Sequence, residues 1–163
     1  MAVVHIRIDN RLIHGQVTVA WASFFGANHL ICTNDDVAKD PIQKMILPQA
    51  ARGVKTSVLS VAETAEYVKS EQAQKEKILI IAKFPEDALG LLEAGVEVDH
   101  VNVGNQAIIP GTKPVHVTRS VAVTPEHAEV YRAIAKKVKK LTAQTMTTHK
   151  EEDLLELLEK KGL

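Results

Sequence analysis

The segment Arg7-Ile-Asp-Asn-Arg-Leu-Ile-His-Gly-Gln-Val17 joins an apolar run to a helical pattern. The run before it, Val3-Val-His-Ile6, is rich in β-branched residues and is typical of a buried strand. After it, one apolar helix face is predicted for Val17, Ala20, Trp21 and Phe24. An acid, an arginine, a histidine and a glycine are therefore predicted in a strand-to-helix turn, where open α/β sheets bind ligands.

Apolar runs alternate with helical patterns along much of the chain. Further strands are predicted over residues 29–33, 54–59, 77–82 and 98–103. The helices between them begin at Asp40-Pro41, at the capping box Ser60–Glu63 and at Phe84-Pro85. This order predicts an α/β fold, a single domain over residues 1–163 with an open, mostly parallel β-sheet and helices on both faces.

Finer expectations concern individual segments. The sequence predicts a polar loop at Asn34-Asp-Asp36, and a helix after Pro41 that buries Ile42, Met45 and Ile46 and is bent or restarted by Pro48. Towards the C-terminus it predicts short strands at 115–117, 120–123 and 141–145, a helix after Thr124-Pro125, and a capping box Thr148–Glu151 that opens a helix over 152–160. His127 and His149, near these helix starts, are expected to be exposed.

Composition excludes several classes of protein. Lys+Arg and Asp+Glu are both 20, so the net charge is zero and a general nucleic-acid binder is not expected. A single cysteine, Cys32, allows no intramolecular disulfide and suits a reducing cytoplasm. No apolar stretch approaches the roughly 18 residues of a membrane helix. The seven histidines lack metal-ligand spacing, so neither a metal nor another cofactor is expected.

Residue chemistry around the first turn points to a phosphoryl group. A neutral imidazole at His14 can attack phosphorus, and Arg11 offers a fork of donors that suits a phosphate. Backbone N–H groups near Gly15 and Gln16 can hold an anion, and Asp9 is placed to orient its neighbours. The local pattern alone leaves plainer readings open: a surface or capping histidine, and an arginine that merely pairs with an acid.

The sheet topology gathers other polar residues near this turn. Because the carboxyl ends of parallel strands share one edge, we expect the turn to be joined there by Asn34, Asp35, Lys83 and Asn105. The sequence does not say which of them contact His14, and for Lys83 a plain surface lysine is the alternative.

The whole pattern resembles one protein family. The stretch R-I-D-x-R-L-I-H-G-Q-V, a tryptophan-bearing helix, Thr33-Asn-Asp-Asp36, Gly53-Val-Lys55 and Asn102-Val-Gly-Asn105 are similar to the IIB component of the mannose/fructose/sorbose family of bacterial sugar phosphotransferase systems. The matched stretches also resemble the N-acetylgalactosamine-type and related amino-sugar branch of this family. The resemblance covers most of the chain up to about residue 140. Segments 106–114 and 143–150 depart from the pattern, and both are expected to lie away from the His14 loop.

This resemblance implies an open α/β fold and a phosphocarrier. His14 would accept phosphate from a IIA protein on Nδ1 and pass it to a sugar that enters through the membrane components IIC and IID. Arg11 would clamp the phosphate and Asp9 would orient the site, with weaker roles for Gly15, Gln16, Asn34, Asp35, Lys83 and Asn105. The protein would be cytoplasmic and peripherally associated with the transporter, and a homodimer is compatible with the sequence. The runner-up is a non-catalytic regulatory module that binds a phosphometabolite or a nucleotide and needs mainly Arg11 and the backbone anion site. A third possibility is a degenerate IIB chain that serves only as a scaffold.

Overall fold

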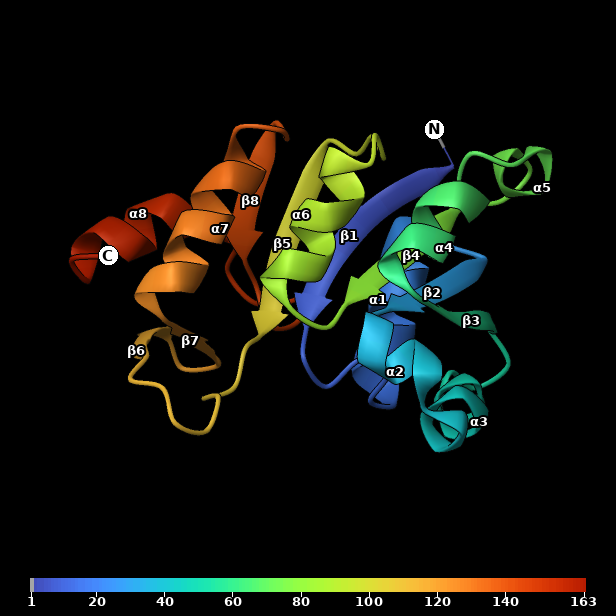
Figure 1. Cartoon of the computed structure of the whole chain (residues 1–163), viewed down its shortest axis with the longest axis horizontal. Helices are drawn as coiled ribbons and strands as arrows, with labels where there is room; N and C mark the ends of the chain where they lie inside the picture. The colour runs from blue at the N-terminus through green and yellow to red at the C-terminus, as the bar shows by residue number, and fades with distance from the viewer. Residues whose placement is uncertain (1) are drawn as a thin grey trace.

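A computed structural model describes residues 2–163 as a seven-stranded sheet in the order β3-β2-β4-β1-β5-β8-β9, beside a two-stranded sheet β6-β7 (Figure 1). The strands of the large sheet are β1 (Val3–Asp9), β2 (His29–Thr33), β3 (Lys55–Leu59), β4 (Ile78–Ala82), β5 (His100–Asn105), β8 (Lys140–Ala143) and β9 (Glu152–Asp153); the small sheet holds β6 (Val115–Thr118) and β7 (Val121–Val123). All pairings in the large sheet are parallel except β8 with β9. The predicted mostly parallel sheet is confirmed.

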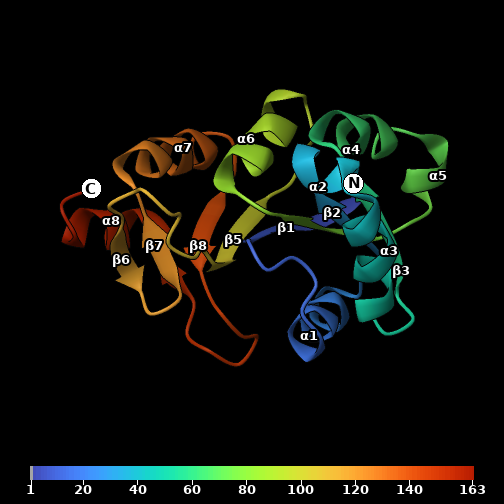
Figure 2. The same cartoon turned by 60° about the horizontal axis from the view of Figure 1, so that its bottom comes forward.

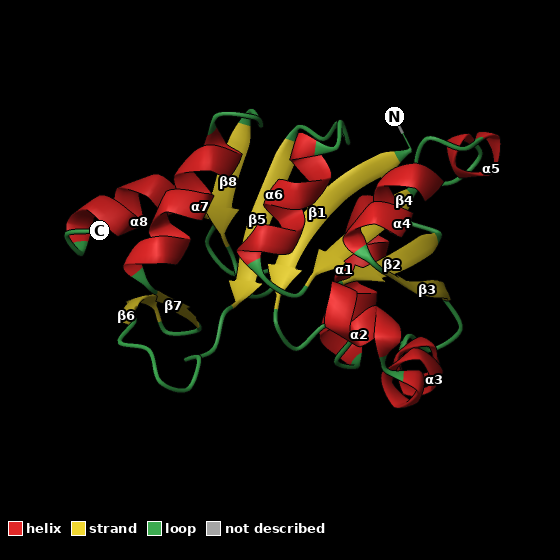
Figure 3. Ribbon diagram, viewed as in Figure 1, coloured by secondary structure: helices red, strands yellow, loops and turns green. Residues whose placement is uncertain are grey.

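Helices cover both faces of this sheet, as predicted (Figures 2 and 3). They are α1 (Gln16–Phe25), α2 (Asp35–Lys39), α3 (Pro41–Ala50), α4 (Val61–Tyr67), α5 (Glu71–Gln74), α6 (Pro85–Glu93), α7 (Pro125–Ala135) and α8 (Leu154–Lys160). Trp21 of α1 and Leu47 of α3 belong to one core, whereas α4, α6, α7 and α8 contribute to the other. Strands that are buried on both sides account for the continuous apolar runs of the sequence.

Strand β1 separates apolar from polar side chains. Ile6 and Ile8 point into the core beneath α6 and α7, and neither is exposed. Because side chains alternate along a strand, Arg7 and Asp9 point to the opposite face, that of α1, and both are buried there. The end of β1 thus carries buried charge into the turn before α1, at the carboxyl edge of the sheet.

Several helix starts follow the predicted capping chemistry. Ser60 and Glu63 form the reciprocal capping box of α4, and Asp40 accepts hydrogen bonds from the backbone N–H groups of Ile42 and Gln43 at the start of α3. Thr124 caps α7, with a proline in the first turn. These helix starts could be predicted because a cap depends only on residues within one helical turn.

The expected burial of one helix face is wrong. Ile42, Met45 and Ile46 of α3 are 65%, 61% and 47% exposed. On the apolar face predicted for α1, Trp21 is buried and Phe24 is 62% exposed. Helix α3 carries apolar residues on two faces, and the face that contains Leu47 meets the sheet. Pro48 lies inside α3, which is a single helix from Pro41 to Ala50 and does not restart at the proline.

Four further expectations are corrected. Asn34 caps the short helix α2 instead of belonging to a loop. The capping box at 148–151 does not form, because residues 152–153 pair with β8 and α8 begins only after its N-cap, Asp153. His127 is 8% exposed and pairs with Glu86, because α7 packs against α6. Segments 106–114 and 143–150, which were expected to lie away from the His14 loop, begin in contact with residues of the site.

Candidate active site at the turn between β1 and α1

The turn between β1 and α1 is held in a strained backbone conformation. Leu12 has φ 60° and Gly15 has φ 69°, and the Leu12 N–H donates to the Asp9 carbonyl over 3.0 Å. Leu12 and Ile13 are buried in the core with Trp21 and Leu47. A non-glycine residue at positive φ persists only where its surroundings fix it. Two buried side chains supply that anchorage, so the polar residues between them have defined positions.

Asp9 is the centre of the polar contacts. Its Oδ1 accepts from the backbone N–H and the Nε–H of Arg11, both over 3.0 Å, and its Oδ2 accepts from Arg11 Nη2 over 2.9 Å. The same Oδ2 lies 3.0 Å from His14 Nε2. Burial alone would raise the pKa of Asp9, but the hydrogen bonds from His14 and Arg11 outweigh it, and the pKa is lowered. Asp9 is therefore an ionised, fully paired carboxylate at neutral pH.

This ionised carboxylate fixes the histidine tautomer. It can only accept hydrogen bonds, so His14 Nε2 carries the proton and Nδ1 carries the lone pair. The His14 side chain is 19% exposed, so the ring is reachable from outside. Its backbone N–H donates to Thr18 Oγ1 over 3.1 Å, and the Thr18 hydroxyl points towards the Leu12 carbonyl at 3.4 Å. Thr18, which the sequence analysis did not single out, ties the loop to the first turn of α1.

Helix α1 starts without a cap. Gly15 is the N-cap residue, no side chain accepts a hydrogen bond there, and the first turn holds no acid. The first N–H groups of a helix have no partner within the helix, and the helix dipole favours an anion beside them. The N-terminus of α1 directly after His14 is therefore suited to a negatively charged group.

Arg7 was missed as a residue of this site. Its guanidinium is buried and donates to the Gln144 and Thr145 carbonyls over 2.9 Å and 2.7 Å, and it lies 3.7 Å from Asp9 Oδ2. It also covers the Trp21 ring at 4.5 Å. Burial lowers the pKa of Arg7 to about 10, which leaves it charged at neutral pH. The available signal was an arginine between Ile6 and Ile8 in a strand that is buried on both faces.

Arg7 draws the segment after β8 against the site. Besides the bonds to Gln144 and Thr145, the Thr145 carbonyl accepts from Trp21 Nε1 over 3.3 Å. On the other side, Asn10 Oδ1 accepts from Asn105 Nδ2 over 2.6 Å and from the Ala107 N–H over 3.2 Å. Both divergent segments, 106–114 and 143–150, therefore begin in contact with residues of this site rather than away from it.

The predicted rim residues divide into two groups. Asn105 joins the turn through Asn10. The polar contacts of the others lie at the ends of β2 and β4: Asn34 donates to Asp87, Asp35 accepts from the Val61 N–H, and Lys83 lies 5.3 Å from the Phe84 ring centroid. The structure therefore connects Asp9, Arg11, His14, Gly15, Gln16 and Asn105, and gives Asn34 and Asp35 structural partners elsewhere.

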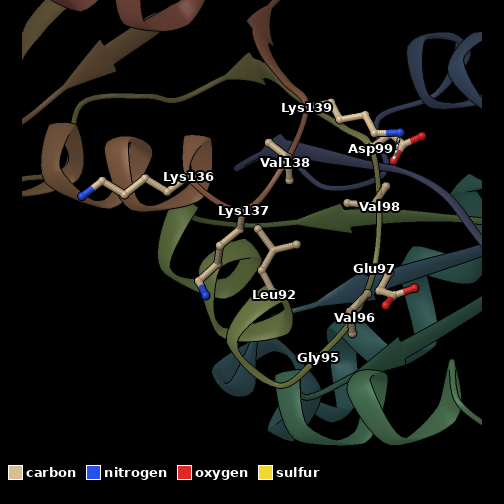
Figure 4. A pocket seen from close by; sticks show the side chains of 10 residues that line it. All are labelled: Leu92, Gly95, Val96, Glu97, Val98, Asp99, Lys136, Lys137, Val138 and Lys139. Atoms are coloured by element: carbon tan, nitrogen blue, oxygen red, sulfur yellow. Dashed lines mark ion pairs between the residues drawn. The ribbon is translucent and has the colours of Figure 1, made fainter.

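A hollow of about 590 Å³ opens at the other edge of the sheet (Figure 4). Residues 95–99, before β5, line one side, and Lys136–Lys139, between α7 and β8, line the other. It is therefore not the His14 site, which sits at the carboxyl ends of the strands. Within residues 2–163 no cluster of three or more His, Cys, Asp or Glu side chains could hold a metal ion, and no helix is long and apolar enough to span a bilayer.

Known proteins share this architecture. The family described as "PTS system sorbose subfamily IIB component" matches residues 3–163. The sorbose-specific EIIB component of Klebsiella pneumoniae is 32% identical over 96% of this chain and 94% of its own length. The N-acetylgalactosamine-specific enzyme IIB component 2 of Escherichia coli K12 is 38% identical over 73% and 76%.

A solved structure agrees with these relatives. The crystal structure of the IIBSor domain of the Klebsiella pneumoniae sorbose permease has a TM-score of 0.91 to this chain at 31% identity, and the match covers 98% of each chain. The IIB components are sugar phosphotransferase components whose family implies IIA, IIC and IID partners. The chain belongs to the sorbose subfamily of IIB components of the sugar phosphotransferase system.

Proposed function

We propose that His14 is the phosphocarrier of this IIB chain. It accepts a phosphoryl group from a IIA protein and passes it to a sugar that enters through IIC and IID. The observation that carries this proposal is the contact between Asp9 and His14 Nε2, at 3.0 Å. It leaves Nδ1 as the nucleophilic nitrogen, beside the uncapped N-terminus of α1.

The reaction has two balanced steps. The lone pair of His14 Nδ1 attacks the phosphorus of the donor's phosphohistidine, a new N–P bond forms, and the donor's N–P bond breaks and returns its electron pair to the donor ring. A sugar hydroxyl oxygen then attacks the same phosphorus and an O–P bond forms, while the hydroxyl proton passes to water or to a base. The bond between phosphorus and His14 Nδ1 breaks and returns its electron pair to the imidazole. Such transfers depend on in-line positioning and on stabilising the charge of the phosphoryl oxygens.

The neighbouring residues have distinct roles in this proposal. Asp9 orients the imidazole and stabilises the positive charge that develops on it during attack. Arg11 commits Nε and Nη2 to Asp9, so Nη1 is the guanidinium nitrogen left for phosphate. Gly15 and Gln16 supply backbone N–H groups. Asn105 supports the turn, and Asn34, Asp35 and Lys83 serve at the rim where a partner approaches.

The same proposal covers class, place and substrate. The chain acts as a protein-Nπ-phosphohistidine–sugar phosphotransferase on the cytoplasmic side of the membrane, peripherally associated with IIC and IID. The stretch that is 38% identical to an N-acetylgalactosamine-specific relative supports an amino sugar of that type as the substrate. Growth on a panel of hexoses and amino sugars, with and without the gene, tests that choice.

Phosphate transfer from labelled phosphoenolpyruvate tests the carrier role. The general phosphotransferase proteins and a family IIA are added to the wild type, to His14→Ala and to His116→Ala, which removes an exposed histidine of β6. We expect acid-labile, base-stable label on the wild type and on His116→Ala, and none on folded His14→Ala. Label that persists on His14→Ala would contradict the carrier role. The absence of label on a folded wild type, beside a working IIA, would contradict it as well. If the wild type is not labelled, phosphometabolite binding that survives His14→Ala would support the regulatory module.

A further inference from the structure

Arg52 brings a second guanidinium to the turn that holds His14. Its Nη2 atom lies 4.0 Å from the position that a Cβ atom would occupy on Gly15, the residue that follows the histidine. The two residues belong to different parts of the chain: Gly15 begins α1, and Arg52 follows the end of α3. Only the packing of α3 beside α1 in the shared core brings them together.

The backbone of Arg52 is unusual for its residue type. Helix α3 ends with Ala51 as its C-cap, and Arg52 follows with φ 51°, in the left-handed region. That position after a helix is commonly occupied by glycine, and the chain places Gly53 immediately afterwards. An arginine in the left-handed region is disfavoured relative to glycine or asparagine. The strained position therefore holds a long cationic side chain where a small residue would be more stable.

Arg52 also differs from the other arginines of the site in its contacts. The guanidinium of Arg7 donates to two backbone carbonyls and pairs with Asp9. The Nε and Nη2 atoms of Arg11 donate to Asp9. Arg52 is exposed, and within residues 2–163 its guanidinium forms no hydrogen bond and no ion pair. It is thus a free cation beside an unpartnered helix N-terminus.

We propose that Arg52 contacts the phosphoryl group on His14, and so acts as a catalytic residue alongside Arg11. This inference rests on the proposed carrier role of His14. Phosphorylation places about two negative charges on the imidazole, and a guanidinium fork binds such oxygens through paired charge-assisted hydrogen bonds. Arg52 would close over the group from the α3 side, opposite the Asp9 contact on Nε2.

The plainer role for Arg52 is an interaction with the C-terminal dipole of α3. That role predicts a change in stability and none in the properties of the phosphorylated protein. The position offers a variant that separates the two, because Asn accepts the left-handed conformation and has no charge. Arg52→Asn should therefore fold at least as well as the wild type if backbone strain dominates, and Arg52→Lys keeps the charge without the fork.

The experiment compares wild type, Arg52→Asn, Arg52→Lys and the control Arg132→Asn, which changes a half-exposed arginine on α7 that pairs with Glu129. Each is phosphorylated by a family IIA, the rate is measured, and the phosphorylated chain is then separated from IIA. Its hydrolysis half-life and the pH titration of its ³¹P NMR signal are recorded. These last two readings involve the chain alone, so they are independent of contacts with the donor.

We expect Arg52→Asn to be phosphorylated roughly 5- to 20-fold more slowly, as befits a partly exposed charge-assisted contact. Its ³¹P titration should shift to higher pH, because a nearby cation favours the dianion. Arg52→Lys should lie between it and the wild type, and the control should match the wild type. Unchanged titration and half-life in folded Arg52→Asn would overturn the phosphate contact even if transfer slowed, since the residue would then serve the partner. An unlabelled wild type would instead overturn the carrier role itself.

Discussion

Replacing Asp9 with asparagine tests the arrangement of the site most directly. The substitution keeps the shape of the side chain and removes its charge, on which Arg11, His14 and Arg7 all depend. An amide can present either oxygen or N–H₂ to His14 Nε2, so the tautomer with a free Nδ1 is no longer enforced. A hydrogen bond to a charged group contributes about 1.5–3 kcal/mol.

The expected loss of rate follows from that contact. If the charge-assisted bond is realised during attack, its loss raises the barrier by a similar amount, and about 1.4 kcal/mol corresponds to a tenfold change. Phosphorylation of Asp9→Asn from a IIA donor should therefore be roughly 10- to 150-fold slower than that of the wild type. Rapid-quench measurement of label on His14 under single-turnover conditions provides the assay.

The same substitution has a consequence for stability. Arg7 is buried and loses the carboxylate of Asp9, so the unfolding free energy at pH 7 should fall. The expected loss is about 3 kcal/mol, the low end for a broken buried pair, because backbone carbonyls still accept from the guanidinium. The pKa of Asp9 is lowered in the folded chain, so its stabilisation is complete above the unfolded pKa of about 3.9 and is lost as pH falls through the folded value. In urea unfolding, the difference in unfolding free energy between the wild type and Asp9→Asn should therefore become smaller below about pH 4.

A second Asp-to-Asn variant serves as the control for Asp9→Asn. Asp40→Asn makes the same chemical change at the N-cap of α3, where asparagine caps as well as aspartate. It should leave both the rate and the stability near wild type. A folded Asp9→Asn protein that is phosphorylated at the wild-type rate would refute the reasoning, because the carboxylate would then have no part in orienting His14.

Three further predictions concern residues around the site and the core. In Gly104→Ala the new Cβ would overlap the buried guanidinium of Arg7, so the unfolding free energy should fall by about 3 kcal/mol or more. In Gly26→Ala, where φ is 64° but the space is open, it should fall by about 1 kcal/mol, and similar urea midpoints for the two variants would contradict this. Thr18→Val removes the acceptor of the His14 N–H and should slow phosphorylation roughly 2- to 10-fold. An unchanged rate would show that buried Leu12 and Ile13 hold the loop without this hydrogen bond. Burial raises the pKa of Cys32 to about 12, so a thiol reagent at pH 8 should label it only in denaturant; rapid labelling of the native chain would show that β2 opens readily.

The sequence was sufficient for the features that local chemistry decides. Asp9, Arg11 and His14 lie within six residues, so a strand followed by a helix start already places them together. The resemblance to a family added their proposed roles, and the alternating apolar runs gave the parallel sheet. The unpredicted helix α2 belongs to the same level, since Asn34 is a strong N-cap that could have been recognised.

Contacts between distant residues were beyond such reasoning. Arg7 reaches Thr145, 138 positions along the chain, and needs Gly104 of the neighbouring strand β5 to leave room for its guanidinium. No periodicity links these three positions. The prediction for α3 was wrong for a different reason. Apolar residues lie on two faces of this helix, so the sequence alone did not determine which face is buried. In the structure Leu47 is buried and Met45 is exposed.

The exposure of the site has a consequence for specificity. The His14 side chain is 19% exposed and that of Arg11 is 38% exposed, and buried Leu12 and Ile13 anchor the turn in the core. A sugar gains selective affinity from a concave site that surrounds it, and a partly exposed turn of this kind surrounds little of a hexose. Under the proposed function, this chain supplies a rigid, oriented phosphohistidine to two successive partners, and the walls that distinguish one sugar from another have to come from the membrane components.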